Sequence, residues 1–75
     1  MGSQGKEGVS LVAFSIVIPA FNEENYLGNT LDSLRSGMSE IPDLKGEIIV
    51  VDNNSSDKTA EVANSKGARV VFEPI

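Results

Sequence analysis

Cysteine and histidine are both absent from the 75-residue chain, and each absence excludes a kind of site. No disulfide can form, and a zinc site built from the usual nitrogen and sulfur ligands is not expected. Without histidine, a Ser-His catalytic relay is excluded as well. A chain of this length buries only about 60% of the surface that its unfolded form exposes. We therefore expect one small domain of marginal stability, without the usual covalent or metal staples.

Basic residues are scarce, since six lysines and arginines stand against eleven aspartates and glutamates, for a net charge of -5. No basic stripe is present, which argues against nucleic acid and anionic membranes as partners. The apolar stretch of residues 9–21 is too short to span a bilayer and contains Pro19. Lys6 is offset by Glu7 and no convincing cleavage pattern follows, which argues against a secretory signal. The sequence predicts a cytoplasmic protein with no nucleic-acid partner.

Three short apolar runs predict β-strands. Residues 14–19 form a β-branched run that ends on proline, residues 47–52 form a run that ends on a carboxylate, and residues 68–72 form a third. The segment before the first run begins with glycine, serine and lysine and shows no periodicity, so residues 1–13 are expected to be a flexible tail. The folded unit is predicted to extend over residues 14–75.

Two helices are expected between these strands. Asn22 is a natural N-cap for the first helix, and acidic residues follow in the first turn, where the helix dipole favours negative charge. Apolar residues at helical spacing extend to Leu34, and Gly37 is expected to end the helix. A shorter helix is predicted over residues 58–66, closed by Gly67.

The order strand, helix, strand, helix, strand predicts an α/β fold with a three-stranded parallel sheet and two helices. If the strands add side by side in one direction, right-handed crossovers put both helices on the same face of the sheet. The strands are apolar on both sides, yet the chain offers no element for the second face. An open apolar face is a liability. We expect more of the same protein, or a partner, to cover it, and we expect the chain alone to self-associate there.

Polar clusters follow the first and the second strand, at residues 19–24 and 52–57. Open parallel sheets bind ligands outside the carboxyl ends of their strands, and neighbouring strands lie about 4.8 Å apart, so both clusters face one crevice. Asp52 can accept hydrogen bonds from a base or a ribose, or it can close a turn. Phe21 can form a wall for a planar ring, or pack against the first helix. Glu23 can bind a ribose or only favour the helix start. No catalytic nucleophile with a base can be named.

These clusters resemble the signatures of family 2 glycosyltransferases. Residues 15–24, SIVIPAFNEE, are similar to the family's opening strand and loop, a hydrophobic run followed by Pro-x-Tyr/Phe-Asn-Glu. Residues 47–59, EIIVVDNNSSDKT, are similar to the second signature, commonly Val-Asp-Asp/Asn-Gly/Asn-Ser-x-Asp, and residues 67–71 continue the resemblance. The two signatures together, in this order and spacing, are more specific than either alone. Within the family, the chain most resembles the dolichyl-phosphate-mannose-synthase-like branch.

The resemblance implies a GT-A fold, a Rossmann-like nucleotide-binding architecture, and a hexosyltransferase type of activity. The donor would be a UDP- or GDP-linked sugar, and the acceptor a lipid-linked molecule or a saccharide. The resemblance also implies that Pro19, Ala20, Phe21 and Glu23 contribute to the nucleotide-sugar site and that Asp52 contacts the base.

The family's Asp-x-Asp motif, which holds Mg²⁺ or Mn²⁺ against the diphosphate, is absent from these residues. Without that metal the departing diphosphate has no electrophilic help. We therefore interpret the chain as an amino-terminal fragment, inactive alone, of a parent enzyme in the cytoplasm or at the cytoplasmic face of a membrane. One alternative is a non-catalytic βαβαβ module that binds a nucleotide or a protein. A receiver-like domain is disfavoured, because residues 19–21 occupy the place of its acidic cluster.

Overall fold

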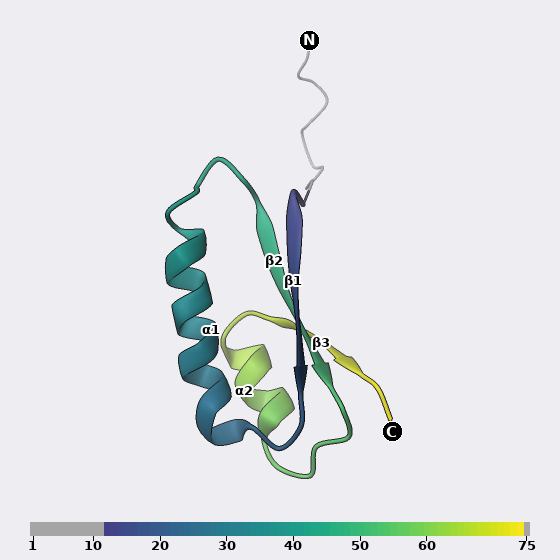
Figure 1. The fold of residues 1–75 in the computed structure, drawn as a ribbon. Coiled ribbons are helices and arrows are strands. Elements are labelled where there is room, and N and C mark those ends of the chain that lie inside the picture. Colours follow the sequence, from purple (N-terminus) through teal and green to yellow (C-terminus); the bar gives the residue numbers. More distant parts are fainter. Residues whose placement is uncertain (1–11, 75) are drawn as a thin grey trace.

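The computed structural model describes residues 12–74 and has the predicted order of elements. These elements are β1 (Phe14–Ala20), α1 (Glu24–Met38), β2 (Gly46–Asp52), α2 (Thr59–Ser65) and β3 (Arg69–Phe72). All three strands are parallel and lie in the order β1-β2-β3 (Figure 1). The predicted α/β fold is thereby confirmed. Most of the predicted tail, residues 1–13, lies outside the described residues, as does Ile75.

Both helices pack on one face of the sheet, as the crossover rule requires (Figure 1). Side chains alternate along each strand, so every second residue faces the helices. A cluster of buried apolar residues forms the core on this side. Its members are Ala20, Leu27, Leu31, Ile48, Val50, Ala63 and Ala68. The central strand β2 supplies the fully buried Ile48 and Val50, because it has a neighbour on each side and helices above it.

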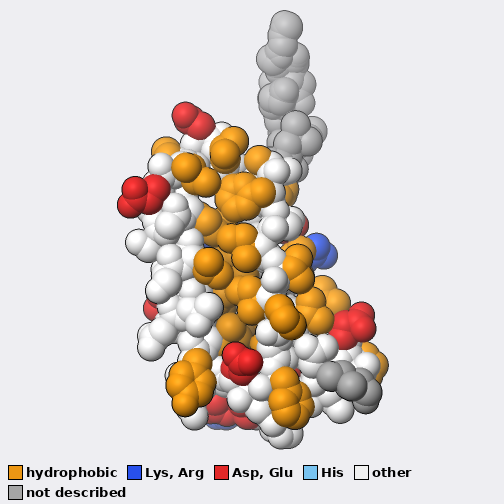
Figure 2. Space-filling model, in the orientation of Figure 1, with side chains coloured by type: hydrophobic (Ala, Val, Ile, Leu, Met, Phe, Trp, Pro, Cys, Tyr) orange, Lys and Arg blue, Asp and Glu red, His pale blue; other side chains and the backbone are white. Residues whose placement is uncertain are grey.

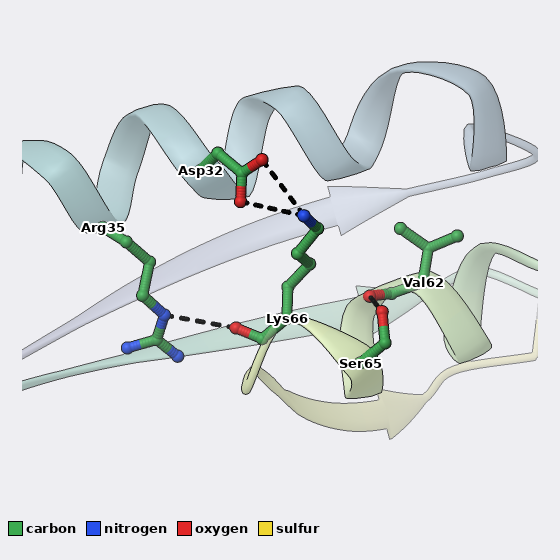
Figure 3. A network of polar contacts seen from close by, with 5 residues as sticks. All are labelled: Asp32, Arg35, Val62, Ser65 and Lys66. Atoms are coloured by element: carbon green, nitrogen blue, oxygen red, sulfur yellow. Dashed lines mark hydrogen bonds and ion pairs between the residues drawn. The ribbon is translucent and has the colours of Figure 1, made fainter.

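Two basic side chains join the helices (Figure 3). The ammonium of Lys66, just past α2, lies 3.0 Å from a carboxylate oxygen of Asp32 on α1. Arg35 of α1 donates from Nε to the Lys66 carbonyl at 3.2 Å and from Nη2 to the Gly67 carbonyl at 2.7 Å. A helix leaves its last carbonyl groups without intrahelical partners. Arg35 therefore supplies the carboxyl end of α2 with donors from another helix.

Two of the predicted helix boundaries are wrong. Asn22 does not cap α1; it adopts a left-handed backbone with φ of 51°, and Glu23 is the N-cap residue, without a side-chain cap of its own. Gly37 does not end α1, which continues to Met38 because that side chain packs against the core. The prediction that Gly67 closes α2 is confirmed, since its φ of 84° is the left-handed conformation that ends many helices.

The face of the sheet opposite the helices is open, as predicted. Val17 of β1 is 58% exposed there, and its register partner Ile49 is only half-buried. Three polar residues lie across the amino-terminal half of this face: Ser15 donates to Glu47 at 2.9 Å, and Glu47 lies 3.8 Å from Arg69. The apolar part of the open face therefore lies toward the carboxyl ends of the strands.

The two helices also leave part of their own face of the sheet uncovered. Ile16 and Ile18 of β1 face the helices but stay half-buried, because β1 is an edge strand with a neighbour on one side only. In Figure 2 hydrophobic side chains gather in a band beside α1, over the strands. Neither described helix has the length and the apolar stretch that crossing a membrane requires.

Candidate functional site

Two loops meet at the carboxyl edge of the sheet, where the sequence predicts the site. The register pairs Ala20, the last residue of β1, with Asp52, the last residue of β2. The N–H of Asn53 donates to the Ala20 carbonyl at 2.8 Å, which extends the pairing by one residue beyond the strands. The loops 21–23 and 53–58 therefore begin at the same level, side by side.

Asp52 is a buried carboxylate, with 3% of its surface exposed. Its Oδ1 accepts the N–H of Ser55 at 3.0 Å, which is the turn-closing role that was one of the two predicted readings. Within residues 12–74, Oδ2 receives no hydrogen bond. A buried carboxylate oxygen without a donor carries a desolvation cost that a ligand N–H or O–H relieves. The turn and the binding role are thus compatible.

The four predicted site residues at the end of β1 and in the first loop differ in what they present. Phe21 is 56% exposed, so it is not buried against α1 as a staple. Pro19 lies on the open face of the sheet, while Ala20 is buried in the core with its carbonyl already bonded. Glu23 is half-buried, and its backbone N–H is occupied. Phe21 is therefore the member of this set whose side chain is most accessible to a ligand.

The first turns of the two helices cap each other. The N–H of Glu23 donates to the Thr59 hydroxyl at 2.8 Å, and the N–H of Glu24 donates to Asp57 Oδ2 at 3.2 Å. In return, the N–H of Lys58 donates to Glu24 Oε1 at 3.0 Å. Neither N-cap residue, Glu23 or Lys58, uses its own side chain as a cap. The start of α1 thus takes its acceptors from Thr59 and Asp57, and the start of α2 takes one of its acceptors from Glu24 of α1, which fixes the loops relative to one another.

Asp57 and Thr59 are central to this arrangement. Both the N–H and the hydroxyl of Thr59 donate to Asp57 Oδ1, the N–H at 2.9 Å. Partial burial raises the pKa of the Asp57 carboxyl, but the hydrogen bonds from Thr59 and from the Glu24 N–H outweigh it. The pKa of Asp57 therefore lies below its ordinary value of 3.8. Its carboxylate is ionised at neutral pH and acts as an acceptor.

The sequence interpretation missed this reciprocal capping. The segment 53–57 was recognised as a turn whose side chains bond backbone groups, but the expected partners were its own backbone groups. Several of the actual partners lie more than 30 residues away, in the loop after β1. The one local signal was the abundance of short polar side chains in both loops.

A divalent cation was expected for the parent protein, but the described residues do not fit one. No group of three or more potential metal-ligating side chains is present in residues 12–74. Asp57 already receives several donors, and one oxygen of Asp52 is used in its turn. The same residues enclose no pocket. The arrangement places an exposed aromatic residue, Phe21, and a buried carboxylate, Asp52, at one edge of the sheet, beside two loops that are bonded to each other.

A parallel sheet with right-handed crossovers, and with loops gathered at the carboxyl ends of its strands, is a Rossmann-like α/β arrangement. A sequence model of the family described as glycosyl transferase family 2 matches residues 15–74. The chain belongs to this family.

Relatives and solved structures agree with this assignment. A 4,4'-diaponeurosporenoate glycosyltransferase of Staphylococcus haemolyticus is 40% identical over 65 residues, which cover 87% of this chain and 16% of the relative. The crystal structure of mannosyl-3-phosphoglycerate synthase from Rubrobacter xylanophilus superimposes with a TM-score of 0.72 at 36% identity, over 81% of this chain and 20% of that one.

A third similar protein was crystallised with ligands. Glucosyl-3-phosphoglycerate synthase from Mycobacterium tuberculosis, solved with Mn²⁺, UDP and glucosyl-3-phosphoglycerate, has a TM-score of 0.64 and 39% identity, over 81% of this chain and 21% of that chain. The present chain thus spans about a fifth of the length of the proteins it matches. These similarities support the predicted GT-A fold. The dolichyl-phosphate-mannose-synthase-like branch stays a prediction.

Proposed function

We propose that this chain is the nucleotide-binding part of a glycosyltransferase that moves a hexose from a nucleotide-sugar donor to an acceptor. The proposal rests on one observation: the exposed Phe21 ring and the buried Asp52 carboxylate lie at the same edge of the sheet. A planar ring can stack on a base, and a carboxylate oxygen without a donor can accept the N–H of a base or a ribose hydroxyl. The family membership makes a nucleotide-sugar the ligand to test.

The diphosphate of such a donor needs groups beyond those described. The two loops, the end of β2 and the first residue of α1 carry one basic side chain, Lys58, against four carboxylates: Glu23, Glu24, Asp52 and Asp57. The N–H groups of Glu23 and Glu24 are already bonded to side chains, so they are not free to bind a phosphate. We therefore propose that Mg²⁺ or Mn²⁺, held by residues outside this chain, neutralises the diphosphate in the parent protein. The chain alone is then inactive in transfer.

UDP is the first nucleotide to test, because a similar protein was crystallised with it, and GDP is the second. The acceptor stays open between a lipid-linked molecule and a saccharide. The names of the similar proteins point to different acceptors although they share this region, so we expect acceptor choice to depend on other parts of those chains. A cytoplasmic location, or a parent at the cytoplasmic face of a membrane, also stays a prediction.

The test is a titration of the chain with UDP and GDP, followed by NMR at the backbone amides of Phe21 and Asp52. We expect weak binding, with shifts confined to the two loops, and a loss of these shifts in Phe21→Ala and Asp52→Asn. Tyr26→Ala is the matched control, since Tyr26 is 71% exposed on α1 and belongs to neither loop. Absence of any shift at millimolar nucleotide would contradict the proposal and favour a non-catalytic module of another kind.

We also propose that the chain by itself associates with a second copy through the open face of the sheet. The apolar part of this face is three strands wide, at about 4.8 Å per strand, and a few residues long, at about 3.3 Å per residue. The product of this width and length is far smaller than the ~800 Å² that each partner buries in a stable interface. Association should therefore be weak and concentration-dependent. Light scattering should show it for the wild type and not for Val17→Lys, whereas Tyr26→Lys, on the helical side, should associate like the wild type. A wild type that stays monomeric at high concentration contradicts the idea.

A further inference from the structure

Asn22, which follows Phe21 in the first loop, forms hydrogen bonds with two residues of the second loop. The N–H of Asn22 donates to the Ser55 hydroxyl at 2.9 Å. Asn22 Oδ1 accepts the N–H of Ser56 at 2.9 Å, and the Ser56 hydroxyl lies within 3.4 Å of the same oxygen. Asn22 is thus both a donor and an acceptor toward two neighbouring serines. Its backbone and its side chain both join the first loop to the second.

Asn22 also has an unusual backbone. Its φ of 51° is a left-handed conformation that residues with a Cβ rarely adopt, although asparagine tolerates it better than most. Strain of this kind persists where the surroundings over-determine the conformation. The bonds to Ser55 and Ser56 provide that constraint, because both need the backbone and the side chain of Asn22 in this arrangement.

The position of Asn22 connects two groups of the candidate site. It follows Phe21 directly, and its partner Ser55 donates its own N–H to Asp52 Oδ1 at 3.0 Å. A continuous path of bonded groups therefore joins the residue that carries the exposed ring to the buried carboxylate. Asn22 itself is exposed and adds nothing to the apolar core.

We propose that Asn22 is a positioning residue, which holds the Phe21 ring and the Asp52 carboxylate at a fixed separation for a nucleotide. This inference rests on the proposed function, but its structural half can be measured without a ligand. Reciprocal capping by Thr59 and Asp57 continues to hold the helix starts when Asn22 is changed. Substitution of Asn22 should therefore loosen the loops and lower nucleotide affinity more than it lowers the stability of the fold.

Three variants of the full 75-residue chain separate the contributions. Asn22→Gly keeps the left-handed backbone and removes the side-chain acceptor; Asn22→Ala removes both; Asn22→Asp keeps an acceptor oxygen and tolerates the backbone. Asn54→Gly is the matched control, since Asn54 is the other left-handed asparagine, with φ of 63°, and within the described residues it makes no side-chain bond to the first loop.

The first measurement uses the free chain. We expect the Ser56 amide to exchange with solvent about tenfold faster in Asn22→Gly and Asn22→Ala, and the order parameter of the Phe21 amide to fall. Asn22→Asp should restore both, and Asn54→Gly should resemble the wild type. Unchanged Ser56 exchange, or an ordered Phe21 amide in Asn22→Gly, overturns the positioning role. If Asn22→Ala does not fold, the measurements on Asn22→Gly alone test the positioning role.

The second measurement titrates UDP into the same proteins. We expect the dissociation constant of Asn22→Gly to rise about five- to tenfold while the melting temperature moves little. Equal affinity for UDP in the wild type and Asn22→Gly overturns the inference even if the loops loosen. If the wild type binds neither UDP nor GDP, the proposed function fails. In that case the exchange rate of the Ser56 amide and the order parameter of the Phe21 amide, both measured in the free chain, still show whether Asn22 holds Phe21 and the second loop in place.

Discussion

Thr59→Val is the substitution that measures the reciprocal capping of α1 and α2 most directly. Thr59 is fully buried, its hydroxyl accepts the N–H of Glu23 at 2.8 Å, and the same hydroxyl donates to Asp57. Valine keeps the shape of threonine and removes only these bonds, so no cavity forms. The substitution leaves the Glu23 N–H without its acceptor, which costs about 1–3 kcal/mol, and removes a second hydrogen bond of about 1 kcal/mol. We expect a total loss of about 2–4 kcal/mol.

That loss is large for this chain. At about 0.05–0.15 kcal/mol per residue, 75 residues have a stability of about 4–11 kcal/mol. Urea unfolding followed by circular dichroism should show a lower midpoint with an unchanged slope, and the melting temperature should fall by about 10–30 °C. Thr30→Val is the matched control, because the Thr30 hydroxyl is exposed and, among residues 12–74, bonds only the Tyr26 carbonyl one helical turn away, at 3.2 Å. It should change stability by no more than about 0.5 kcal/mol. If the two valine variants are equally stable, the reciprocal capping does not stabilise the fold.

Three further substitutions test other parts of the structure. Because the folded-state pKa of Asp57 lies below 3.8, its ionised form stabilises the fold above that value, and this contribution is lost as the pH falls through the folded-state pKa. The melting temperature of the wild type should therefore exceed that of Asp57→Asn at pH 7, and the gap should close below about pH 4; a gap independent of pH refutes this. Gly67→Ala should lower the unfolding free energy by about 1–2 kcal/mol, because a Cβ would sit at φ of 84° and 2.9 Å from Arg35 Nη2. Gly37→Ala should raise it by about 0.5–1 kcal/mol, since Gly37 lies inside α1 with open space around the added methyl; urea denaturation of both variants shows whether the signs differ as expected.

The fold was predictable because its signals are local and the rules that join them are general. Each strand is a short β-branched run, and one such run, Ile48 to Val51, became the most buried strand of the sheet. Right-handed crossovers then fix the strand order and the single layer of helices without further information. The same reasoning gives the open second face, on which Val17 is exposed.

The helix starts were not predictable in the same way. A capping rule assigns Asn22 to α1, because a local side chain is the usual acceptor for the first N–H groups. In the structure Thr59 and Asp57 supply these acceptors from another loop, so Asn22 is free to turn the chain and bond Ser56 instead. At the other end, Gly37 follows the local preference for a stop, but packing of Met38 extends the helix past it. Both failures occur where a distant contact outweighs a local preference.

The position of the candidate site at the strand ends was predictable, and the hydrogen bonds that hold its two loops together were not. The positions of Phe21 and Asp52 at strand ends follow from the sequence pattern alone, and the register places their loops side by side. The sequence left open whether Phe21 packs on the first helix, and its exposure decides against that. It also left open whether Asp52 closes a turn, and the bond from Ser55 shows that it does so with one oxygen only. Such choices depend on side-chain geometry, which no spacing rule specifies.

The two helices and the candidate site form one cooperative unit. Helix α2 has seven residues, whereas isolated helices shorter than about 12–15 residues are marginal in water. Its N-cap residue, Lys58, provides no side-chain cap. At its start, Asp57 accepts the Thr59 N–H, but the Lys58 N–H needs Glu24 of α1 as its acceptor. At its end, Arg35 of α1 donates to the Lys66 carbonyl. Both ends of α2 therefore take part of their capping from α1. Because the loop after β2 runs directly into α2, ordering of that loop requires α1 to be docked. Loosening the contact between the helices should thus disorder the turn around Asp52 before it unfolds the sheet.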